Sequence, residues 1–303
     1  MKCLITGVGG FIGYHLSTFL QKQGVEVVGI RRKKRGDEAG ARLFEGDILD
    51  RTFLSKVLRE TSPSIIYHLA AQSLPVLSWQ RPQETFEINV IGTTNLLESV
   101  RQLGLKTRIV FCGSSSEYAP SDEPIQEDQR LEPSSPYAAS KIAGSMMSKL
   151  YHTAYNTDVV IVRPFFIIGP RKIGDVCSTF AKGIVDVERG RCDFISVGNL
   201  SAVRDFLDVR DASRAFQTVS EKGVTGEVYN ICSGNGCKIE TVLHRMISRA
   251  QYPIDIRHDQ SPRPIDLPIA IGANDKLRSL GWNQEVSLEE SLASILEYWR
   301  GNN

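Results

Sequence analysis

The 303-residue chain has no excess of charge of one sign, because 36 Lys and Arg residues are balanced by 35 Asp and Glu residues. Proteins that bind nucleic acids or anionic membranes usually carry a clear basic excess. The chain also has no apolar stretch of about 20 residues, the length that crosses a bilayer. We therefore expect no nucleic-acid partner and no membrane contact.

The six cysteines form no CxxC pair and have no histidine cluster beside them, so the pattern favours neither a disulfide framework nor a metal site. Cys3 and Cys112 lie in apolar, strand-like runs, which is typical of buried thiols in a reducing compartment. The first residues, MKCLITG, have no pattern of a secretory signal. These absences predict a cytoplasmic protein without a bound metal.

The first half of the chain alternates strand-like and helix-like stretches. Short apolar runs predict strands at residues 2–6, 25–30, 64–70, 108–113 and 159–163. Helical spacing of apolar side chains predicts helices over residues 11–23, 89–103 and 136–155. Since parallel strands need crossovers of this length, we expect an α/β fold with a doubly wound parallel Rossmann sheet.

Beyond residue 165 the pattern breaks into shorter pieces rich in Pro, Gly and charge. We expect residues 1–165 to form a dinucleotide-binding Rossmann domain. Residues 166–203 and 231–303 are expected to form a smaller mixed α/β substrate-binding domain. Between them, residues near 204–230, with the runs RDFLDVRD and GEVYNIC, are expected to return to the first sheet.

A glycine-rich turn follows the first predicted strand, with Gly7, Gly10 and Gly13 in G-x-x-G-x-x-G spacing and Phe11 and Ile12 among them. Such glycines permit a sharp turn, close approach of a pyrophosphate and tight packing of helix on strand. Free N–H groups at the start of the next helix can then bind phosphate. A tight turn without a ligand is the alternative, but the strand–turn–helix context favours a dinucleotide site.

The end of the second predicted strand has no acidic residue. Enzymes that use NAD place Asp or Glu there to bind the ribose 2′-hydroxyl, whereas an Arg accommodates the 2′-phosphate of NADP. This chain has Arg31 and Arg32, and no acid before Asp37. The pattern favours NADP(H); NAD(H) stays open, as does a solvated basic loop.

Tyr137 and Lys141 lie four residues apart in a predicted helix, so their side chains share one face. A neighbouring ammonium is expected to lower the pKa of a phenol, which is ordinarily near 10. Before this helix, Ser114, Ser115 and Ser116 follow a strand at the edge where open α/β sheets bind ligands. A lone YxxxK also occurs on surfaces by chance, but the three motifs in this order are much more specific.

Together these motifs resemble the extended short-chain dehydrogenase/reductase family of nucleotide-sugar epimerases, dehydratases and reductases. The similarity covers nearly the whole chain, through TGVGGFIG, EGDILD, IIYHLAA, NVIGT, SPYAASK, VRPFFIIGP and VRDFLDVRD. The resemblance implies a homodimer and a nucleotide-sugar substrate, with Ser114, Tyr137 and Lys141 as the catalytic residues.

The resemblance also implies binding residues. Those expected at the cofactor, besides the glycine turn, Arg31, Arg32, Tyr137 and Lys141, are Asp47, Ile48, Leu69, Ala70, Ala71 and Arg163. Those expected at the substrate are Ser115, Ser116, Arg171, Arg204 and Arg263. Within these sets, Asp47 and Ile48 would flank the adenine, and Arg204 and Arg263 would reach substrate phosphates.

Three long runs, VGNLSAVRDFLDVRDASRAF, GEVYNICSGNG and SPRPIDLPIAIGANDKLRSLGW, are similar to the subgroup that reduces GDP-4-keto-6-deoxymannose. They predict an NADPH-dependent reductase of a nucleotide-activated 4-keto-6-deoxy sugar. Two alternatives stay open: an NAD-dependent nucleotide-sugar epimerase with the same three catalytic residues, and a dinucleotide-sensing module without turnover. The intact serine, tyrosine and lysine argue against the module.

The chain departs from the family at two positions. Dehydratases carry an acid two residues before the tyrosine that is Tyr118 here, and this chain has Ser116. Glu117 is one place off, and in an extended segment it would face away from the substrate. Phe166 replaces the usual sugar-binding Asn. His68, in a predicted strand, is interpreted as a packed core histidine, and Trp79 as a core or interface aromatic.

Overall fold

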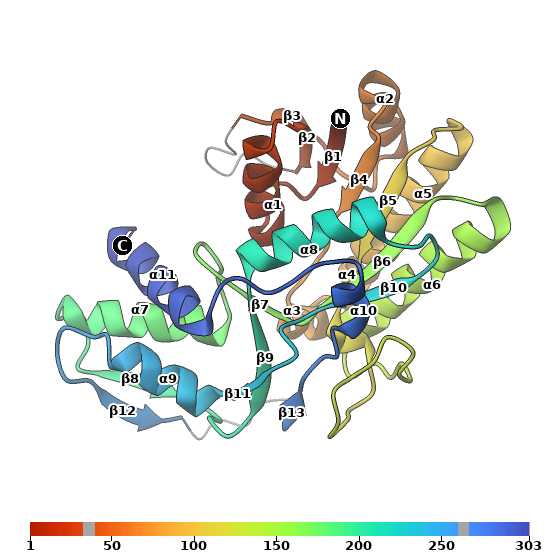
Figure 1. Cartoon of the computed structure of the whole chain (residues 1–303). Coiled ribbons are helices and arrows are strands. Elements are labelled where there is room, and N and C mark those ends of the chain that lie inside the picture. Colours follow the sequence, from red (N-terminus) through yellow and green to blue (C-terminus); the bar gives the residue numbers. More distant parts are fainter. Residues whose placement is uncertain (33–39, 260–266, 303) are drawn as a thin grey trace.

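The computed structural model describes residues 1–32, 40–259 and 267–302. Its larger part is a seven-stranded parallel sheet in the order β10-β6-β5-β4-β1-β2-β3, as Figure 1 shows. The strands are β1 (Lys2–Thr6), β2 (Glu26–Arg31), β3 (Arg42–Glu45), β4 (Ile65–His68), β5 (Arg108–Cys112), β6 (Val159–Pro164) and β10 (Val228–Ile231). The order 3-2-1-4-5-6 within this sheet is that of a Rossmann fold, so the predicted doubly wound sheet is confirmed.

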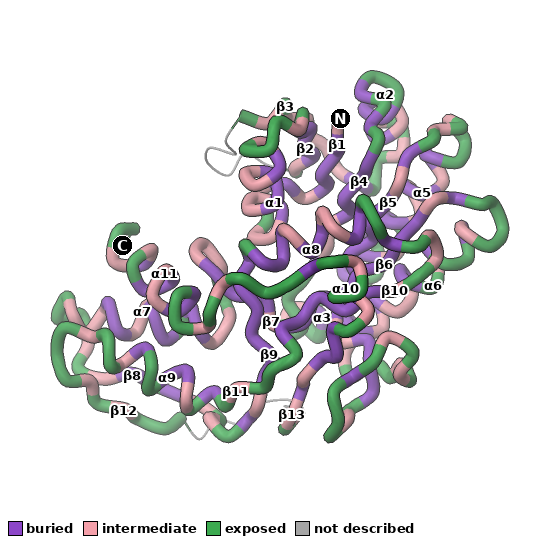
Figure 2. The backbone as a smooth tube through the Cα atoms, in the orientation of Figure 1, coloured by how far each residue is buried: buried purple, intermediate pink, exposed green. Residues whose placement is uncertain are grey.

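Helices cover both faces of this sheet, so the inner strands β1, β4, β5 and β6 are almost entirely buried. Cys3 and Ile5 of β1 join one core with Leu16 of α1 and Phe216 of α8. Leu4, which points the other way, joins a second core with residues of α2, α5 and α6. Figure 2 shows these strands as buried between the layers. The helices are α1 (Phe11–Lys22), α2 (Arg51–Thr61), α5 (Gly92–Gln102), α6 (Pro136–Tyr155) and α8 (Val209–Lys222).

The smaller part is a mixed assembly with its own apolar core. Its strand β9 pairs antiparallel with β11 and parallel with β13 and β7, while β8 and β12 form a separate pair. The expected smaller mixed α/β unit is therefore present. Its elements are β7 (Phe166–Ile168), α7 (Val176–Glu188), β8 (Phe194–Val197), β9 (Val203–Asp208), β11 (Gly236–Lys238), α9 (Ile239–Ile247), β12 (Asp255–His258), β13 (Ile269–Ala270) and α11 (Leu288–Gly301). Helix α10 (Asp275–Ser279) packs instead on the large sheet, where Leu277 joins the core that contains Tyr229 and Ile231 of β10.

The segment expected to return to the first sheet does so only in part. Strand β10 and helix α8 pack with the large sheet, but β9 lies in the smaller sheet. The reason is that β10 occupies the free edge of β6, with Val228 opposite Ile161. Strand β9 pairs instead with β7, which follows β6 in the chain, with Phe166 opposite Phe206.

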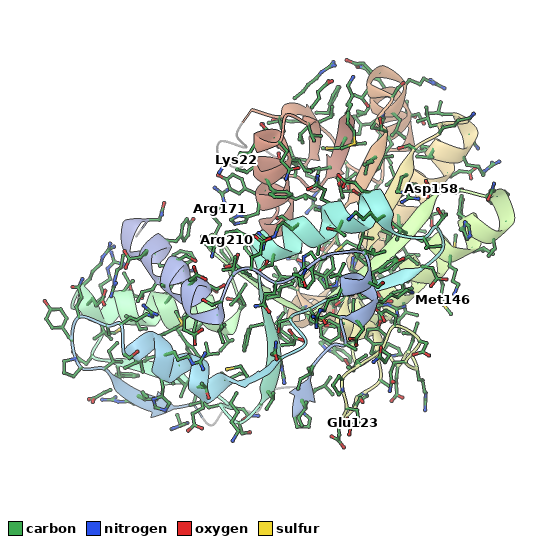
Figure 3. The ribbon with its side chains drawn as sticks, viewed as in Figure 1. Lys22, Glu123, Met146, Asp158, Arg171 and Arg210 are labelled. Atoms are coloured by element: carbon green, nitrogen blue, oxygen red, sulfur yellow. The ribbon has the colours of Figure 1, made fainter. Side chains whose placement is uncertain are left out.

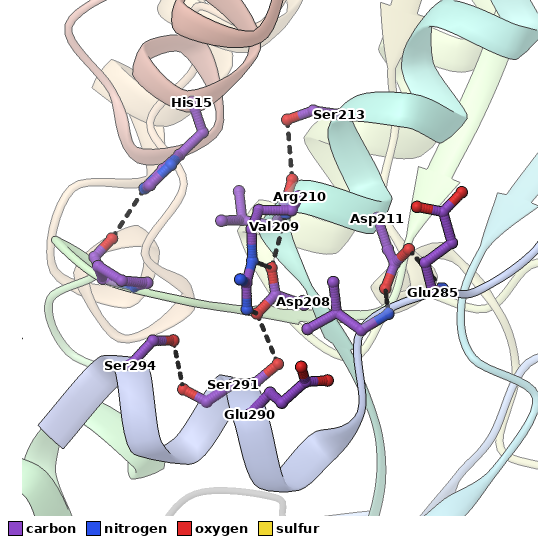
Figure 4. Close-up of polar contacts among 12 residues, drawn as sticks. His15, Asp208, Val209, Arg210, Asp211, Ser213, Glu285, Glu290, Ser291 and Ser294 are labelled. Atoms are coloured by element: carbon purple, nitrogen blue, oxygen red, sulfur yellow. Dashed lines mark hydrogen bonds and ion pairs between the residues drawn. The ribbon is translucent and has the colours of Figure 1, made fainter. Parts of the chain in front are cut away.

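Two buried carboxylates fix the junction between the two parts, as Figure 4 shows. Asp208 caps α8 and accepts a hydrogen bond of 2.5 Å from the Ser291 hydroxyl on α11. Asp211 accepts hydrogen bonds of 2.9 Å from the N–H groups of Glu285 and Val286, just before α11. These bonds attach the last helix to the first turn of α8 and so set how the smaller part sits beside the sheet.

Shorter elements complete the chain between the strands. They are α3 (Pro75–Gln80), α4 (Pro82–Phe86), the π-turn η1 (Glu87–Ile91) and the 3-10 turn η2 (Ser115–Glu117). The helix expected over residues 89–103 is thus a π-turn that continues into α5. No helix in the described part of the chain is long and apolar enough to cross a membrane.

Candidate active site

A cavity of about 1690 Å³ lies along the carboxyl ends of the parallel strands, between the glycine turn and the smaller sheet. Both parts of the molecule line it. This edge is where open α/β sheets bind their ligands, and a cavity that spans two parts is the usual form of a ligand site.

The glycine turn after β1 forms one wall of the cavity. Gly7 has φ of +73°, and a Cβ atom there would lie 2.9 Å from the Cα of Ala70. A Cβ at Gly13 would lie 2.4 Å from the carbonyl oxygen of Gly7. Gly10 is the N-cap residue of α1 and makes no side-chain hydrogen bond to the helix. The first N–H groups of α1, beginning at Phe11, therefore lack a side-chain cap. This backbone fits an anionic group such as a phosphate.

Arg31 and Arg32 also line the cavity. Arg31 forms an ion pair of 2.8 Å with Glu45, its neighbour in the register of β2 and β3. Sequence reasoning did not place this acid beside Arg31, because β3 was not predicted. The other residues expected at the cofactor that do line the cavity are Phe11, Ile12, Asp47, Ile48, Leu69, Ala70 and Ala71.

Two segments of the chain bring the three predicted catalytic residues together at the cavity wall: Ser114, Tyr137 and Lys141. Ser114 follows β5, whereas Tyr137 and Lys141 lie on α6, which begins at Pro136 after Ser135 caps it. All three are at least nine-tenths buried. The Nζ atom of Lys141 donates a hydrogen bond of 2.5 Å to the carbonyl oxygen of Cys112.

The environment of Tyr137 favours the protonated phenol. Burial raises the pKa of Tyr137, and its hydrogen bond with Ser114 opposes that rise. Burial also lowers the pKa of Lys141. The expectation that a neighbouring ammonium lowers the tyrosine pKa is therefore wrong, because desolvation dominates in this buried position. A phenol that stays protonated near neutral pH is suited to donate a proton.

The serine run turns differently from the expected extended segment. Ser115 and Ser116 line the cavity, and residues 115–117 form the 3-10 turn η2. Glu117 does not line the cavity and is fully buried on the other side of the turn. The expectation that Glu117 faces away from the cavity is confirmed, although a tight turn and not an extended strand causes it.

Two arginines expected at ligands do not line the cavity. Arg163 is buried and forms an ion pair of 2.9 Å with Glu117. Arg171, labelled in Figure 3, lies over the ring of Tyr14 on α1, at 3.6 Å. Its φ of +72° turns the chain at this point, and the next residue, Lys172, lines the cavity instead.

The smaller part contributes Arg204 to the cavity, as the sequence led us to expect. Its guanidinium lies 5.3 Å from the ring of Phe166. Arg263 lies outside the described residues. Trp79 is 54% exposed and lines the cavity, so it is not a core aromatic; a role at an interface stays a prediction. No spacing in the sequence distinguishes such a wall residue from a core aromatic.

His68 is a packed core histidine, as predicted. Its two ring nitrogens form hydrogen bonds of 2.8 and 3.0 Å with the hydroxyls of Thr6 and Thr93. Sequence reasoning missed Asn89, whose amide donates 2.9 Å to the hydroxyl of Ser140, beside Lys141. Asn89 therefore connects the π-turn η1 to the helix that carries Tyr137.

Comparison with known proteins identifies the class. The profile of the NAD dependent epimerase/dehydratase family matches residues 3–232. The chain therefore belongs to this family, and it is an enzyme of the short-chain dehydrogenase/reductase type. This excludes the alternative of a module without turnover.

Particular relatives are a reductase and an epimerase. The chain is 30% identical to GDP-6-deoxy-D-mannose reductase of Pseudomonas aeruginosa, over 98% of this chain and 97% of the relative. It is 32% identical to UDP-glucose 4-epimerase of Mycolicibacterium smegmatis, over 99% of both chains. The identities are too close to separate the two activities.

Solved structures agree on the fold. RMD from Pseudomonas aeruginosa complexed with NADPH has a TM-score of 0.89 at 28% identity, covering 100% of this chain and 99% of that one. UDP-glucose 4-epimerase of Thermus thermophilus in complex with NAD has a TM-score of 0.90 at 27% identity, covering both chains completely.

Proposed function

We propose that the protein is an NADPH-dependent reductase of a nucleotide-activated 4-keto-6-deoxy sugar. The observation that carries the proposal is that Arg31 and Arg32 line the same cavity as Ser114, Tyr137 and Lys141. Two arginines suit a 2′-phosphate. The Pseudomonas aeruginosa relatives, a GDP-6-deoxy-D-mannose reductase and a structure with NADPH, support this choice.

In this proposal the large sheet holds the dinucleotide. The turn from Gly7 to Gly13 binds the pyrophosphate through its N–H groups, and Arg31 and Arg32 bind the 2′-phosphate. Asp47 and Ile48 flank the adenine, and residues 69–71 line the groove. When bound, NADPH would supply the hydride, and the protein sets its position and the local field.

Tyr137 then donates its phenolic proton to the keto oxygen, which becomes a hydroxyl. Ser114 donates a hydrogen bond to the same oxygen and so stabilises the charge that develops on it. Lys141, one helical turn from Tyr137, offsets the negative charge left on the phenol oxygen. Burial suits this direction of reaction, because the raised pKa of Tyr137 keeps the acid protonated.

The smaller part holds the sugar nucleotide in this proposal. Residues 166–208 with β11, α9, β12, β13 and α11 would form the substrate domain, and residues 1–165 with α8, β10 and α10 the dinucleotide domain. Arg204 and Arg263 would bind substrate phosphates, and Ser115 and Ser116 the sugar. A homodimer in the cytoplasm stays a prediction, and light scattering on the purified protein tests the dimer.

An NAD-dependent epimerase is the second candidate. The observation that favours it is the ion pair between Arg31 and Glu45, which offsets one of the two positive charges at the end of β2. An epimerase retains its NAD through turnover and needs no added NADPH. The deciding experiment measures whether purified protein carries bound NAD, or consumes added NADPH with a 4-keto sugar nucleotide. Thermal stabilisation by a panel of GDP, UDP and dTDP sugars then identifies the nucleotide.

A further inference from the structure

One buried side chain contacts both elements that carry the proposed catalytic residues. The Oε1 atom of Glu117 accepts a hydrogen bond of 2.8 Å from the N–H of Ser114. Its Oε2 atom accepts one of 2.8 Å from the hydroxyl of Ser145 on α6. Ser145 lies four residues after Lys141, so it occupies the same face of α6 as Tyr137 and Lys141. The carboxylate therefore bridges the turn of Ser114 and the helix of Tyr137.

The chain around Glu117 accommodates this bridge closely. A Cβ atom at Gly113 would lie 2.3 Å from the Oε1 atom of Glu117, so only glycine permits the approach. Ser114 and Glu117 also form a reciprocal capping box around the turn η2. The bridge thus depends on a specific residue on each side, which distinguishes it from an incidental contact.

The counter-charge of Glu117 is Arg163 on β6, at 2.9 Å, and both side chains are at most 5% exposed. Arg163 donates a further hydrogen bond to the carbonyl oxygen of Glu127. Burial raises the pKa of the Glu117 carboxyl, and the charge of Arg163 opposes that rise. Such a pair contributes little net stability, but it is costly to break from one side.

We propose that Glu117 is a positioning residue for the reaction: its carboxylate fixes the turn of Ser114 against α6, so that the Ser114 hydroxyl and the Tyr137 phenol address the same substrate oxygen. The proposal rests on the proposed function, because it takes Ser114 and Tyr137 as the catalytic pair. Glu117 does not line the cavity, and it acts only through these two residues.

Glu117 also acts on the protonation of the pair. Burial is the main cause of the raised pKa of Tyr137, and the negative charge of Glu117 adds to it. For Lys141, burial lowers the pKa and Glu117 opposes that fall. Loss of the carboxylate therefore lowers the pKa of Tyr137, so that the acid loses its proton at a lower pH.

The test is Glu117→Gln, which keeps the shape, removes the charge and replaces one of the two acceptor oxygens with an NH2 group, so that the bonds to Ser114, Ser145 and Arg163 cannot all be kept. We expect kcat to fall about 10- to 100-fold, the effect of small misplacements of reacting groups. The alkaline limb of the pH profile of kcat should move to lower pH, and the Kd of NADPH should stay within about threefold. Glu188→Gln is the matched control, because the side chain of Glu188 is 6% exposed and also pairs with an arginine, Arg300, but in the smaller part. It should lower Tm and leave kcat and the pH profile unchanged.

Ser145→Ala is the second variant, for the case in which Glu117→Gln does not fold. It removes only the bond to α6 and should lower kcat about 3- to 10-fold, since one hydrogen bond is lost. A Glu117→Gln protein that loses stability but keeps kcat and its pH profile would overturn the proposal. So would an unchanged kcat in Ser145→Ala when Glu117→Gln does not fold.

A failure of the proposed function gives a different result. Wild-type protein would then turn over no 4-keto sugar nucleotide, and the same variants are compared on the epimerase reaction, which uses the same residues. If neither reaction occurs, hydrogen exchange of residues 113–118 and 141–148 decides the positional claim. Faster exchange of both segments in Ser145→Ala supports the bridge, and unchanged exchange of either overturns it.

Discussion

Arg31 at the end of β2 and Glu45 at the end of β3 form an ion pair of 2.8 Å across two strands in register. An NAD enzyme would use an acid in this region for the ribose 2′-hydroxyl, but here the acid already accepts a bond from Arg31. Glu45 is 56% exposed but the Arg31 side chain only 9%, so solvent screens this pair mainly from the side of Glu45. A 2′-phosphate would have to compete with Glu45 for Arg31.

We predict that replacing both Arg31 and Arg32 with Ala raises the KM for NADPH about tenfold or more, the scale of one lost charged contact. The KM for NADH should stay nearly unchanged, because it has no 2′-phosphate. Steady-state kinetics with both cofactors measure this. Arg42→Ala, on β3 and paired with Glu60, is the control and should change neither KM. A clear preference of the wild-type protein for NADH contradicts the NADPH proposal.

The second prediction concerns the proposed proton donor. Tyr137→Phe keeps the ring and removes the hydroxyl, so folding and dinucleotide binding should be nearly intact. Turnover should fall about 10²- to 10⁴-fold, the usual contribution of a general acid. Tyr155→Phe, on the exposed end of the same helix, is the control and should keep full activity. If Tyr137→Phe retains more than roughly a tenth of wild-type kcat, Tyr137 is not the acid.

The sequence predicted the large sheet well because local patterns determine its elements. The apolar run of β1 and the helix α6 over residues 136–155 match the structure, since strands buried on both faces and capped helices leave strong signals. Strand β3 has only four residues and none fully buried, so it carries no such signal. Whether β9 joins the large sheet or the smaller one depends on which strand pairs with the free edge of β6. Long-range contacts decide this pairing, and no local pattern in the sequence reveals them.

In the candidate site, too, local motifs predicted some residues correctly, whereas the position of others depends on the folded structure. The glycine turn and the YxxxK helix place their residues at the cavity, because backbone geometry fixes where they point. Arg171 and Lys172 are adjacent, and one positive φ decides which of them lines the cavity. The pKa of Tyr137 depends on burial, which spacing in the sequence does not reveal.

The third prediction is acid sensitivity caused by His68. Burial, with a smaller contribution from the charge of Lys141, lowers the pKa of His68 from 6.5 to about 3. The folded protein keeps this histidine neutral, whereas the unfolded chain binds a proton below about pH 6.5. Stability is therefore fully present above that pH and is lost as pH falls toward 3. The loss should be about 2 kcal/mol between roughly pH 7 and pH 5.

Urea unfolding at several pH values measures this dependence. His68→Gln should be less stable at neutral pH, because the bonds to two threonines are altered, but its stability should depend less on pH. His244→Gln, at an exposed position on α9, is the control and should keep the wild-type dependence. An unchanged slope in His68→Gln would show that other groups cause the acid sensitivity.

The fourth prediction is that the protein is not a 4,6-dehydratase. That reaction removes a proton from C5 and expels the C6 hydroxyl, so it needs an acid–base group beside Tyr137. Family dehydratases carry an acid at the position of Ser116, and a serine hydroxyl is neither acidic nor basic enough near neutral pH. The nearest carboxylate in sequence, Glu117, is fully buried and bonded to Ser114, Ser145 and Arg163.

The buried ion pair makes it costly for Glu117 to act in place of the acid that is missing at the position of Ser116. To reach the cavity its side chain would have to leave Arg163 uncompensated in the core, and breaking such a pair costs about 3–5 kcal/mol. We therefore expect no dehydrated product from GDP-mannose, dTDP-glucose or UDP-GlcNAc, measured as loss of water by mass spectrometry. Only substrates that already carry the ketone should be reduced. Dehydration on the order of 1 per second or faster would contradict both this exclusion and the reductase proposal, because the enzyme would then make the ketone itself.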